Sequence, residues 1–183
     1  MIYKDYRENL NAWRRSYIHR IKESLFDKVI KGKTLVDIGA GSGYVSIEMA
    51  RLGLRVYSCD ITSKAITNLK DYKRKFKLED LTVLRCFAEK IPLPKNRVDY
   101  IVANAILEHL PDEKKAIIEW RRILKPKGKI FVTTPLKYRY IWPFYWPINI
   151  IHDRVLGHLR RYDLKSLENL FQLRVKKVYY TGH

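Results

Sequence analysis

The sequence has few cysteines, no long apolar run and no signal-peptide pattern at its start, which argues against disulfide-rich, membrane-spanning and secreted proteins. Only Cys59 and Cys86 are cysteines among its 183 residues, too few for a disulfide framework or a structural zinc site. No apolar run approaches the roughly 20 residues needed to cross a bilayer. The first residues lack the basic and then apolar pattern of a signal peptide. We therefore expect reduced thiols and a cytoplasmic location.

Acidic residues are also scarce relative to basic ones. Asp and Glu total 19 whereas Lys and Arg total 37, which gives a formal net charge of +18. A surface of this sign attracts anions such as nucleic acids, lipid headgroups and phosphorylated substrates. Because the basic residues are spread along the chain, a generally basic or heat-adapted composition is the alternative interpretation.

Hydrophobic periodicity predicts one domain built mainly from alternating strands and helices. No internal repeat, low-complexity segment or Gly/Ser linker divides the chain. Alternation over residues 33–134 is typical of parallel βαβ units, and strands that are apolar on both faces suit a buried parallel sheet. The strands expected in this part are 34–37, 55–59, 81–86, 98–103 and 129–134, and the helices run to about 52, from 63 to 77 and from 112 to 124.

The two ends of the chain are expected to differ from this alternating core. Apolar residues recur every four positions within 5–30, which predicts an N-terminal helix. Residues 135–162 have little periodicity and predict a loop or a short-helix insertion. Residues 163–171 then predict a helix, and 173–180 alternate like a strand.

A glycine-rich run, Leu35-Val-Asp-Ile-Gly-Ala-Gly-Ser-Gly43, lies where the first strand should turn into a helix. Glycines permit positive φ and let a ligand lie against the backbone, and the helix that follows offers unpaired N–H groups. Such a loop suits a carboxylate or a phosphate. Position 44 is Tyr, so the dinucleotide fingerprint G-x-G-x-x-G fails, and no Gly-Lys-Ser/Thr follows for a Walker A loop.

Two carboxylates accompany this loop. Asp37 lies two residues before the first glycine, where it can accept hydrogen bonds from an ammonium group. Asp60 ends the second strand, and ligands of open α/β sheets lie outside the carboxyl ends of the strands. An isolated Asp at such a place is more often a helix cap, but beside the glycine loop we interpret Asp60 as a group that accepts both hydroxyls of a ribose.

With these residues, and with Ala88-Glu-Lys-Ile-Pro-Leu-Pro94, Leu107-Glu-His-Leu110 and Leu124-Lys-Pro-Lys-Gly-Lys-Ile-Phe131, the chain resembles the class I S-adenosylmethionine-dependent methyltransferases. It is most similar to the subgroup often called type 11, which includes ubiquinone and menaquinone biosynthesis methyltransferases. The resemblance runs from about residue 33 to 135. It implies an α/β, Rossmann-like fold with a mainly parallel central sheet and helices on both faces. The family has seven strands, the last of them antiparallel, whereas we expect six here. Either the natural protein continues further or the final strand is lost.

The resemblance also implies roles for particular residues in binding S-adenosyl-L-methionine. Asp37 would hold the amino group of the methionine moiety, and Asp60 would hold the ribose. Asn104 would lie below the sulfonium. The loop residues Gly39, Ala40 and Gly41 would pass under the cofactor, with backbone amides near its carboxylate. The remaining cofactor residues would be Gly43 of the same loop, and Ile61, Phe87 and Ala88 beside the adenine. Many relatives have Asp where this chain has Phe87, so adenine would be read by the backbone or by stacking.

His109 is the first candidate for a catalytic base. Resembling quinone O-methyltransferases have Glu-x-x-Glu-His here and can hold a divalent metal with it, but Ala105 replaces the first Glu of that pattern. Glu108 and His109 alone are too few for a metal, so we expect none. The alternative interpretation is that His109 orients a loop.

A second candidate cluster lies within residues 152–162 and contains Gly157-His-Leu-Arg-Arg-Tyr162, similar to a stretch in some type 11 enzymes. His158 and Tyr162 are further catalytic candidates. His152, Arg160 and Arg161 are candidates for binding an anionic acceptor, because guanidinium groups pair with phosphate or carboxylate. The alternative is a solvated turn whose arginines pair with Asp153 and Asp163.

The aromatic run from Tyr138 to Trp146 lies beside basic residues, and from it Trp142 and Tyr145 are further acceptor-binding candidates. Trp and Tyr next to Lys and Arg suit a membrane interface. A substrate lid or a packed corner of the core would explain the run equally well.

These observations predict a single methyltransferase domain over 1–183 that transfers methyl groups from S-adenosyl-L-methionine to a small-molecule or lipid-linked acceptor, in the cytoplasm or peripherally at the membrane. An RNA or DNA methyltransferase is the alternative that the charge favours, although no Asn/Asp-Pro-Pro-aromatic motif ends the fourth strand. A non-catalytic protein that binds the cofactor is a third interpretation. The expected parts are an N-terminal helical cap (1–31), a cofactor-binding core (33–134), an insertion that covers the acceptor (135–162) and a helix with an edge strand (163–183).

Overall fold

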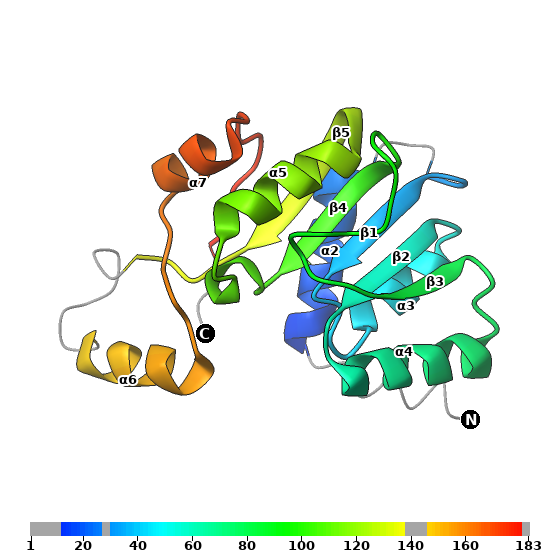
Figure 1. The fold of residues 1–183 in the computed structure, drawn as a ribbon, viewed down its shortest axis with the longest axis horizontal. Helices are drawn as coiled ribbons and strands as arrows, with labels where there is room; N and C mark the ends of the chain where they lie inside the picture. Colours follow the sequence, from blue (N-terminus) through cyan, green and yellow to red (C-terminus); the bar gives the residue numbers. More distant parts are fainter. Residues whose placement is uncertain (1–11, 27–29, 138–145, 181–183) are drawn as a thin grey trace.

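A computed structural model describes residues 12–26, 30–137 and 146–180. Its centre is a sheet of five strands in the order β3-β2-β1-β4-β5, and all neighbouring strands are parallel (Figure 1). The order reverses at β1, so the crevice outside the ends of β1 and β4 is where ligands of such sheets bind. The strands are β1 (Thr34–Ile38), β2 (Arg55–Asp60), β3 (Leu81–Arg85), β4 (Val98–Asn104) and β5 (Leu124–Thr133).

Helices cover both faces of the sheet, because its strands are apolar on both sides. Leu35 of β1 packs with α2, α3 and α4 in one buried cluster. The next residue, Val36, belongs to a second cluster with α5 and α7 on the opposite face. The helices are α2 (Ala12–Leu25), α3 (Tyr44–Arg51), α4 (Ser63–Phe76), the 3-10 turn η1 (Leu107–His109), α5 (Glu113–Ile123), α6 (Trp146–Leu156) and α7 (Leu164–Phe171).

The expected alternation of strands and helices over 33–134 is confirmed, with small shifts at the ends of elements. Thr62 caps α4 and Asp112 caps α5, each through its side chain. β5 begins at Leu124 rather than at 129, because the chain pairs with β4 directly after α5 and shifts register between Val98 and Tyr100.

The strand expected over 173–180 is wrong, since these residues form no regular structure. Instead of pairing with β5, they lie against α2 and α7. The hydroxyl of Tyr179 accepts a hydrogen bond from Ser24, and Glu168 accepts one from the backbone N–H of Val175. These side-chain contacts replace the backbone ladder that a sixth strand would need.

The expectation of two reduced thiols is also wrong for this structure, which joins Cys59 and Cys86 in a disulfide. The sequence separates the two cysteines by 27 positions. Parallel pairing of β2 with β3 nevertheless brings the end of one strand beside the end of the other. Their Cα atoms are 5.9 Å apart, so a contact between neighbouring strands explains a link that spacing along the chain did not indicate.

The insertion after β5 contributes α6, which Figure 1 shows to the side of the sheet toward which the strand arrows point. The segment after α6 returns to the end of the sheet. Leu136 and Tyr162 form a parallel bridge, and the N–H of Leu159 donates to the carbonyl of Glu108. None of the helices in the described part of the chain has the length and hydrophobicity needed to cross a membrane.

Candidate functional site

Asp37 lies near the end of β1, and its side chain is 2% exposed. Its carboxylate accepts a hydrogen bond of 2.6 Å from the hydroxyl of Ser46, which in turn accepts one of 2.5 Å from Ser58. Burial raises the pKa of Asp37 to about 6, and the nearby charge of Asp60 adds a smaller rise. A buried carboxylate with so few donors is suited to a cationic ligand group.

The glycine loop turns the chain from β1 into α3 through three residues of positive φ, Gly39, Gly41 and Gly43. At Gly43, an added Cβ atom would lie 2.7 Å from Cδ2 of Leu69, so the loop packs directly on α4. At Gly39 it would lie 3.0 Å from Cδ1 of Ile106, so the loop also touches the segment after β4. Glycine is therefore required here by packing as well as by conformation.

The backbone amides of the loop donate hydrogen bonds within the protein, and their expected position near the carboxylate of the cofactor stays a prediction. The N–H groups of Gly39 and Ala40 both donate to the carbonyl of Cys59, at 2.8 and 3.1 Å. The N–H of Gly41 donates to the carboxylate of Asp60 at 2.9 Å. These bonds fix the loop against the end of β2.

Asp60 ends β2 and is nearly buried. Besides Gly41, its carboxylate accepts hydrogen bonds of 2.8 Å from the N–H and from the hydroxyl of Thr62. The helix cap itself is Thr62 rather than Asp60, and Asp60 bonds to Thr62 just before α4 begins. The role of Asp60 in holding a ribose stays a prediction. Ile61, which follows it, is 46% exposed although it is apolar.

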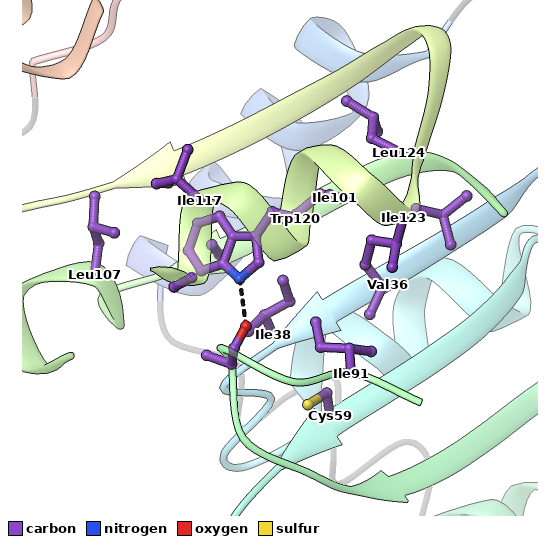
Figure 2. Packing of buried hydrophobic residues seen from close by; sticks show 14 of the residues in the cluster. Val36, Ile38, Cys59, Ile91, Ile101, Leu107, Ile117, Trp120, Ile123 and Leu124 are labelled. Atoms are coloured by element: carbon purple, nitrogen blue, oxygen red, sulfur yellow. Dashed lines mark hydrogen bonds between the residues drawn. The ribbon is translucent and has the colours of Figure 1, made fainter. Parts of the chain in front are cut away.

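Phe87 and Ala88 follow β3 and differ in exposure. The ring of Phe87 is 61% exposed, whereas Ala88 is buried. The carbonyl of Ala88 accepts a 3.0 Å hydrogen bond from Nε1 of Trp120, the buried centre of α5 (Figure 2). This bond connects the segment after β3 to α5. Ile61 and Phe87 are apolar and exposed, so both could contact a flat apolar ligand.

Asn104 ends β4, as expected, but its amide is bonded within the protein. Its Nδ2 donates to the hydroxyl of Tyr44 at 2.8 Å, and its Oδ1 accepts from the hydroxyl of Thr133 at 2.7 Å. Sequence reasoning used Tyr44 only to exclude a dinucleotide site and missed this contact. Burial raises the pKa of Tyr44 well above its ordinary value, so it stays a neutral donor and acceptor.

A second group of polar residues forms where η1 meets the segment after α6. Glu108, His109 and His158 each offer one ligand-type atom, and these atoms lie within 4.8 Å of one another. The two imidazole rings are in edge contact, with centroids 5.0 Å apart. The sequence placed His109 and His158 in separate candidate sites and gave no role to Glu108, because their meeting depends on the path of the insertion.

Hydrogen bonds hold both rings of this group. Nδ1 of His109 is 3.2 Å from the carbonyl oxygen of Gly157, and Nδ1 of His158 is 2.8 Å from Oδ1 of Asp153. Glu108 is 1% exposed, and its Oε2 has no hydrogen-bond partner. Burial raises the pKa of Glu108, although the two histidines oppose that shift.

The two arginines that were candidates for binding an anionic acceptor form ion pairs with acidic residues of the protein itself. Arg161 makes two bonds of 2.7 Å to the carboxylate of Asp153. Arg160 binds Glu113 and the carbonyls at 110 and 111. The alternative interpretation, paired arginines in a turn, thus holds for Arg161 with Asp153, whereas Asp163 pairs with Lys137 instead.

Tyr162 is buried and donates to Glu113 and to the carbonyl of Leu107. Burial, followed by the nearby carboxylate of Glu113, raises the pKa of Tyr162 well above its ordinary value. Its hydroxyl therefore connects η1 to the first turn of α5. Of the other acceptor candidates, Trp142 and Tyr145 lie outside the described residues, and so does the side chain of His152.

Known proteins match this arrangement in sequence. A family model described as "Methyltransferase domain" matches residues 36–132. A ubiquinone biosynthesis O-methyltransferase of Actinobacillus pleuropneumoniae is 32% identical over 137 residues, which cover 68% of this chain and 53% of that protein. One of Coxiella burnetii is 29% identical over 111 residues, 57% of this chain and 44% of that protein. The chain belongs to the class I S-adenosylmethionine-dependent methyltransferase family, type 11, and spans about half the length of these curated relatives.

Solved structures share the fold. The YcgJ protein of Bacillus subtilis superposes with a TM-score of 0.72 at 21% identity, covering 86% of this chain and 66% of that one. A phosphoethanolamine N-methyltransferase of Haemonchus contortus, solved with S-adenosyl-L-methionine, gives 0.74 at 21% identity over 86% of this chain and 36% of that one. These similarities confirm the expected Rossmann-like architecture.

Proposed function

We propose that this chain is a methyltransferase domain that binds S-adenosyl-L-methionine between β1 and β2 and methylates a small-molecule acceptor. The observation that carries the proposal is the pair Asp37 and Asp60, two nearly buried carboxylates that flank the glycine loop. A site with these acids fits a ligand that carries an ammonium group and a ribose rather than a phosphate. Family membership supports the same cofactor.

The residues of the crevice suit each part of that cofactor. Asp37 would accept hydrogen bonds from the ammonium group, because its buried carboxylate is held by Ser46 alone and has no cationic partner among the described residues. Asp60 would accept hydrogen bonds from the ribose hydroxyls. Ile61 and Phe87, both exposed and apolar, would cover the adenine faces. The cofactor supplies a methyl group on a sulfonium centre, and the protein contributes alignment and exclusion of water.

The acceptor is proposed to be a small hydroxylated aromatic molecule. The ubiquinone biosynthesis O-methyltransferases that the chain resembles support this class. His109, which follows β4, and His158 lie next to each other, with ring centroids 5.0 Å apart. Removal of a hydroxyl proton from such an acceptor needs a basic group or a cation nearby. The net charge of +18 is the one observation that favours nucleic acid instead.

Contact with a membrane surface is a finer part of the proposal. Several apolar side chains of α6 and of the turn after it are exposed, among them Ile151, Val155 and Leu159. Arg154 lies among them on the same helix and is exposed as well. An apolar face with basic neighbours suits the boundary between lipid headgroups and acyl chains, where a lipid-like acceptor would be found.

Transfer of a labelled methyl group tests the proposal. The purified chain is incubated with methyl-labelled S-adenosyl-L-methionine and, separately, with catechols, hydroxylated quinols in lipid vesicles, and bulk RNA. Label in a small phenolic product that Asp37→Asn abolishes is the expected result. Label that appears only in RNA would transfer the assignment to nucleic acid, and cofactor binding without label in any of these acceptors would contradict the proposed acceptor class.

A further inference from the structure

A chain of hydrogen bonds with one direction joins the ends of β5 and β4 to Tyr44, the first residue of α3. The hydroxyl of Thr133 donates to Oδ1 of Asn104 at 2.7 Å, and Nδ2 of Asn104 donates to the hydroxyl oxygen of Tyr44 at 2.8 Å. Thr133 in turn accepts from the N–H of Ala105 at 3.0 Å. Each donor in this chain therefore points toward Tyr44.

The direction of the chain leaves the proton of the Tyr44 hydroxyl without an acceptor. A phenol hydroxyl donates one hydrogen bond, and its oxygen accepts others. Asn104 occupies the accepting side, and no atom in the described part of the chain accepts the proton. Tyr44 is nevertheless only 7% exposed. A buried donor without an acceptor is destabilising, so a ligand that brings an acceptor atom to this hydroxyl gains affinity from it.

We propose that the hydroxyl of Tyr44 donates a hydrogen bond to the carboxylate of the methionine moiety of S-adenosyl-L-methionine. This role rests on the proposed function and makes Tyr44 a residue that selects for the amino-acid end of the cofactor. The ammonium group of that moiety has no lone pair, and its sulfur carries a positive charge, so the carboxylate is its strong acceptor. The adenine and the ribose offer acceptors too, but their proposed contacts follow β2 and β3, whereas Tyr44 bonds to the end of β4.

The charges near Tyr44 suit a ligand group that is both cationic and anionic. Burial raises the pKa of Tyr44, the charge of Asp37 adds to the rise, and the charge of Arg14 opposes it. The guanidinium carbon of Arg14, on α2, lies 5.3 Å from the centre of the Tyr44 ring. An acid that suits an ammonium group and a base that suits a carboxylate are thus both close to this side chain. The raised pKa also keeps the hydroxyl protonated at neutral pH.

Packing fixes the ring of Tyr44 before any ligand binds. Its ring is in edge contact with that of Tyr17, with centroids 6.1 Å apart, and Tyr17 makes a similar contact with Phe131 at 5.4 Å. On the other side in sequence, Gly43 packs directly on Leu69 of α4. A donor held in this way loses little conformational freedom when it meets its acceptor, so more of the hydrogen bond is expressed as affinity.

Calorimetry with two ligands tests this role, because they differ in the one group that Tyr44 is proposed to bind. S-adenosylhomocysteine carries both an ammonium group and a carboxylate, whereas its decarboxylated analogue keeps only the ammonium group. We expect Tyr44→Phe to weaken binding of S-adenosylhomocysteine at least about tenfold and to change that of the analogue by no more than about twofold. Asp37→Asn should weaken the binding of both ligands.

Tyr57→Phe is the matched control. It removes a hydroxyl of β2 that accepts hydrogen bonds from Arg97, just before β4, and that has no place in the proposed site. We expect its affinity for both ligands to equal that of the native chain. Circular dichroism and thermal unfolding of each variant show that it is folded.

Three results would contradict this role of Tyr44. Native affinity for S-adenosylhomocysteine in Tyr44→Phe would overturn it and would indicate that the hydroxyl donates to Asn104 instead. An equal weakening of both ligands in Tyr44→Phe would also overturn it, because the hydroxyl would then act on the shape of the crevice rather than on the carboxylate. A folded native chain that binds neither ligand would contradict the proposed function and this role together.

Discussion

Burial of Asp37 sets its chemistry at the scale of single residues. The pKa rises from 3.8 in water to about 6 because the carboxylate is removed from solvent. A raised pKa in the folded state means that folding takes up a proton between about pH 4 and pH 6. The contribution of Asp37 to stability therefore falls as the pH rises through that window and is constant above it. An ammonium group beside the carboxylate acts in the opposite direction and favours its ionised form.

This coupling predicts a pH dependence of cofactor binding. With a pKa of about 6, Asp37 is mostly protonated at pH 5 and mostly ionised at pH 7. We expect the dissociation constant of S-adenosyl-L-methionine to fall about tenfold from pH 5 to pH 7, and to be high and almost independent of pH in Asp37→Asn. Calorimetry at several pH values measures it, and equal affinity of the native chain at pH 5 and pH 7 would show that Asp37 does not meet the ammonium group.

Two glycines with the same φ angle allow the cost of backbone strain to be measured separately from the cost of a side-chain clash. Gly43 and Gly32 both have φ of +77°, but an added Cβ would meet Leu69 at 2.7 Å at the first and nothing within 4 Å at the second. We expect Gly32→Ala to lower the free energy of unfolding by about 1 kcal/mol through backbone strain alone. Gly43→Ala should cost about 1–2 kcal/mol more, because Leu69 is fully buried.

Urea denaturation of both variants measures that difference. We also expect Gly43→Ala to weaken cofactor binding more than Gly32→Ala does. Equal losses of stability in Gly32→Ala and Gly43→Ala would mean that α4 shifts without cost to accept the added methyl group, and that the glycine loop is not packed tightly against it.

Local signals explain why half of the site was predictable at this scale. Asp37, the glycine loop and Asp60 lie within 24 residues in two adjacent strands, so their spacing along the chain is enough to mark them as candidates, and their binding role stays a prediction. The uses of the amides of Gly39 to Gly41 were not predictable, because their acceptors at Cys59 and Asp60 belong to another strand.

At the scale of elements, α5 connects the sheet to the segment that follows β3. Trp120 is fully buried against β1 and β4 residues, and it donates its indole N–H to the carbonyl of Ala88 (Figure 2). The adjacent residue Phe87 is a proposed adenine contact. Packing of the helix should therefore affect the crevice as well as the stability of the fold.

Replacement of the indole tests that link. Trp120→Phe removes the hydrogen bond and leaves the carbonyl of Ala88 buried without its donor, so we expect the free energy of unfolding to fall by about 2–3 kcal/mol. Cofactor affinity should weaken with it. Ile118→Ala, on the exposed side of the same helix, should change stability by no more than about 0.5 kcal/mol. Chemical denaturation compares the two, and similar losses would contradict the central role given to Trp120.

Elements with strong periodicity were predictable, and elements defined by distant partners were not. The apolar positions of α5, such as Ile117 and Trp120, repeat with the helical period and are buried as expected. The apparent strand 173–180 also alternates, but its partners are side chains of α2 and α7 rather than a strand. The meeting of His109 with His158 depends on where the insertion returns, which no local pattern encodes.

At the scale of the whole molecule, five parallel strands place two polar groups at one end of the sheet. Asp37 and Asp60 end β1 and β2, whereas Glu108 and His109 follow β4 on the other side of the reversal in strand order. The side chain of Ile106, which follows β4, packs against Gly39 of the glycine loop. Under the proposed function, the first group would bind the cofactor and the second would lie beside the acceptor, and a group-transfer enzyme needs both reactants held side by side.

Calorimetric titration of the purified chain with S-adenosylhomocysteine tests the central claim most directly. The account predicts one site per chain, lost in Asp37→Asn with the circular dichroism spectrum retained, and unchanged in Glu79→Gln, which removes an exposed carboxylate elsewhere. No binding by the native, folded chain at millimolar ligand would contradict the account.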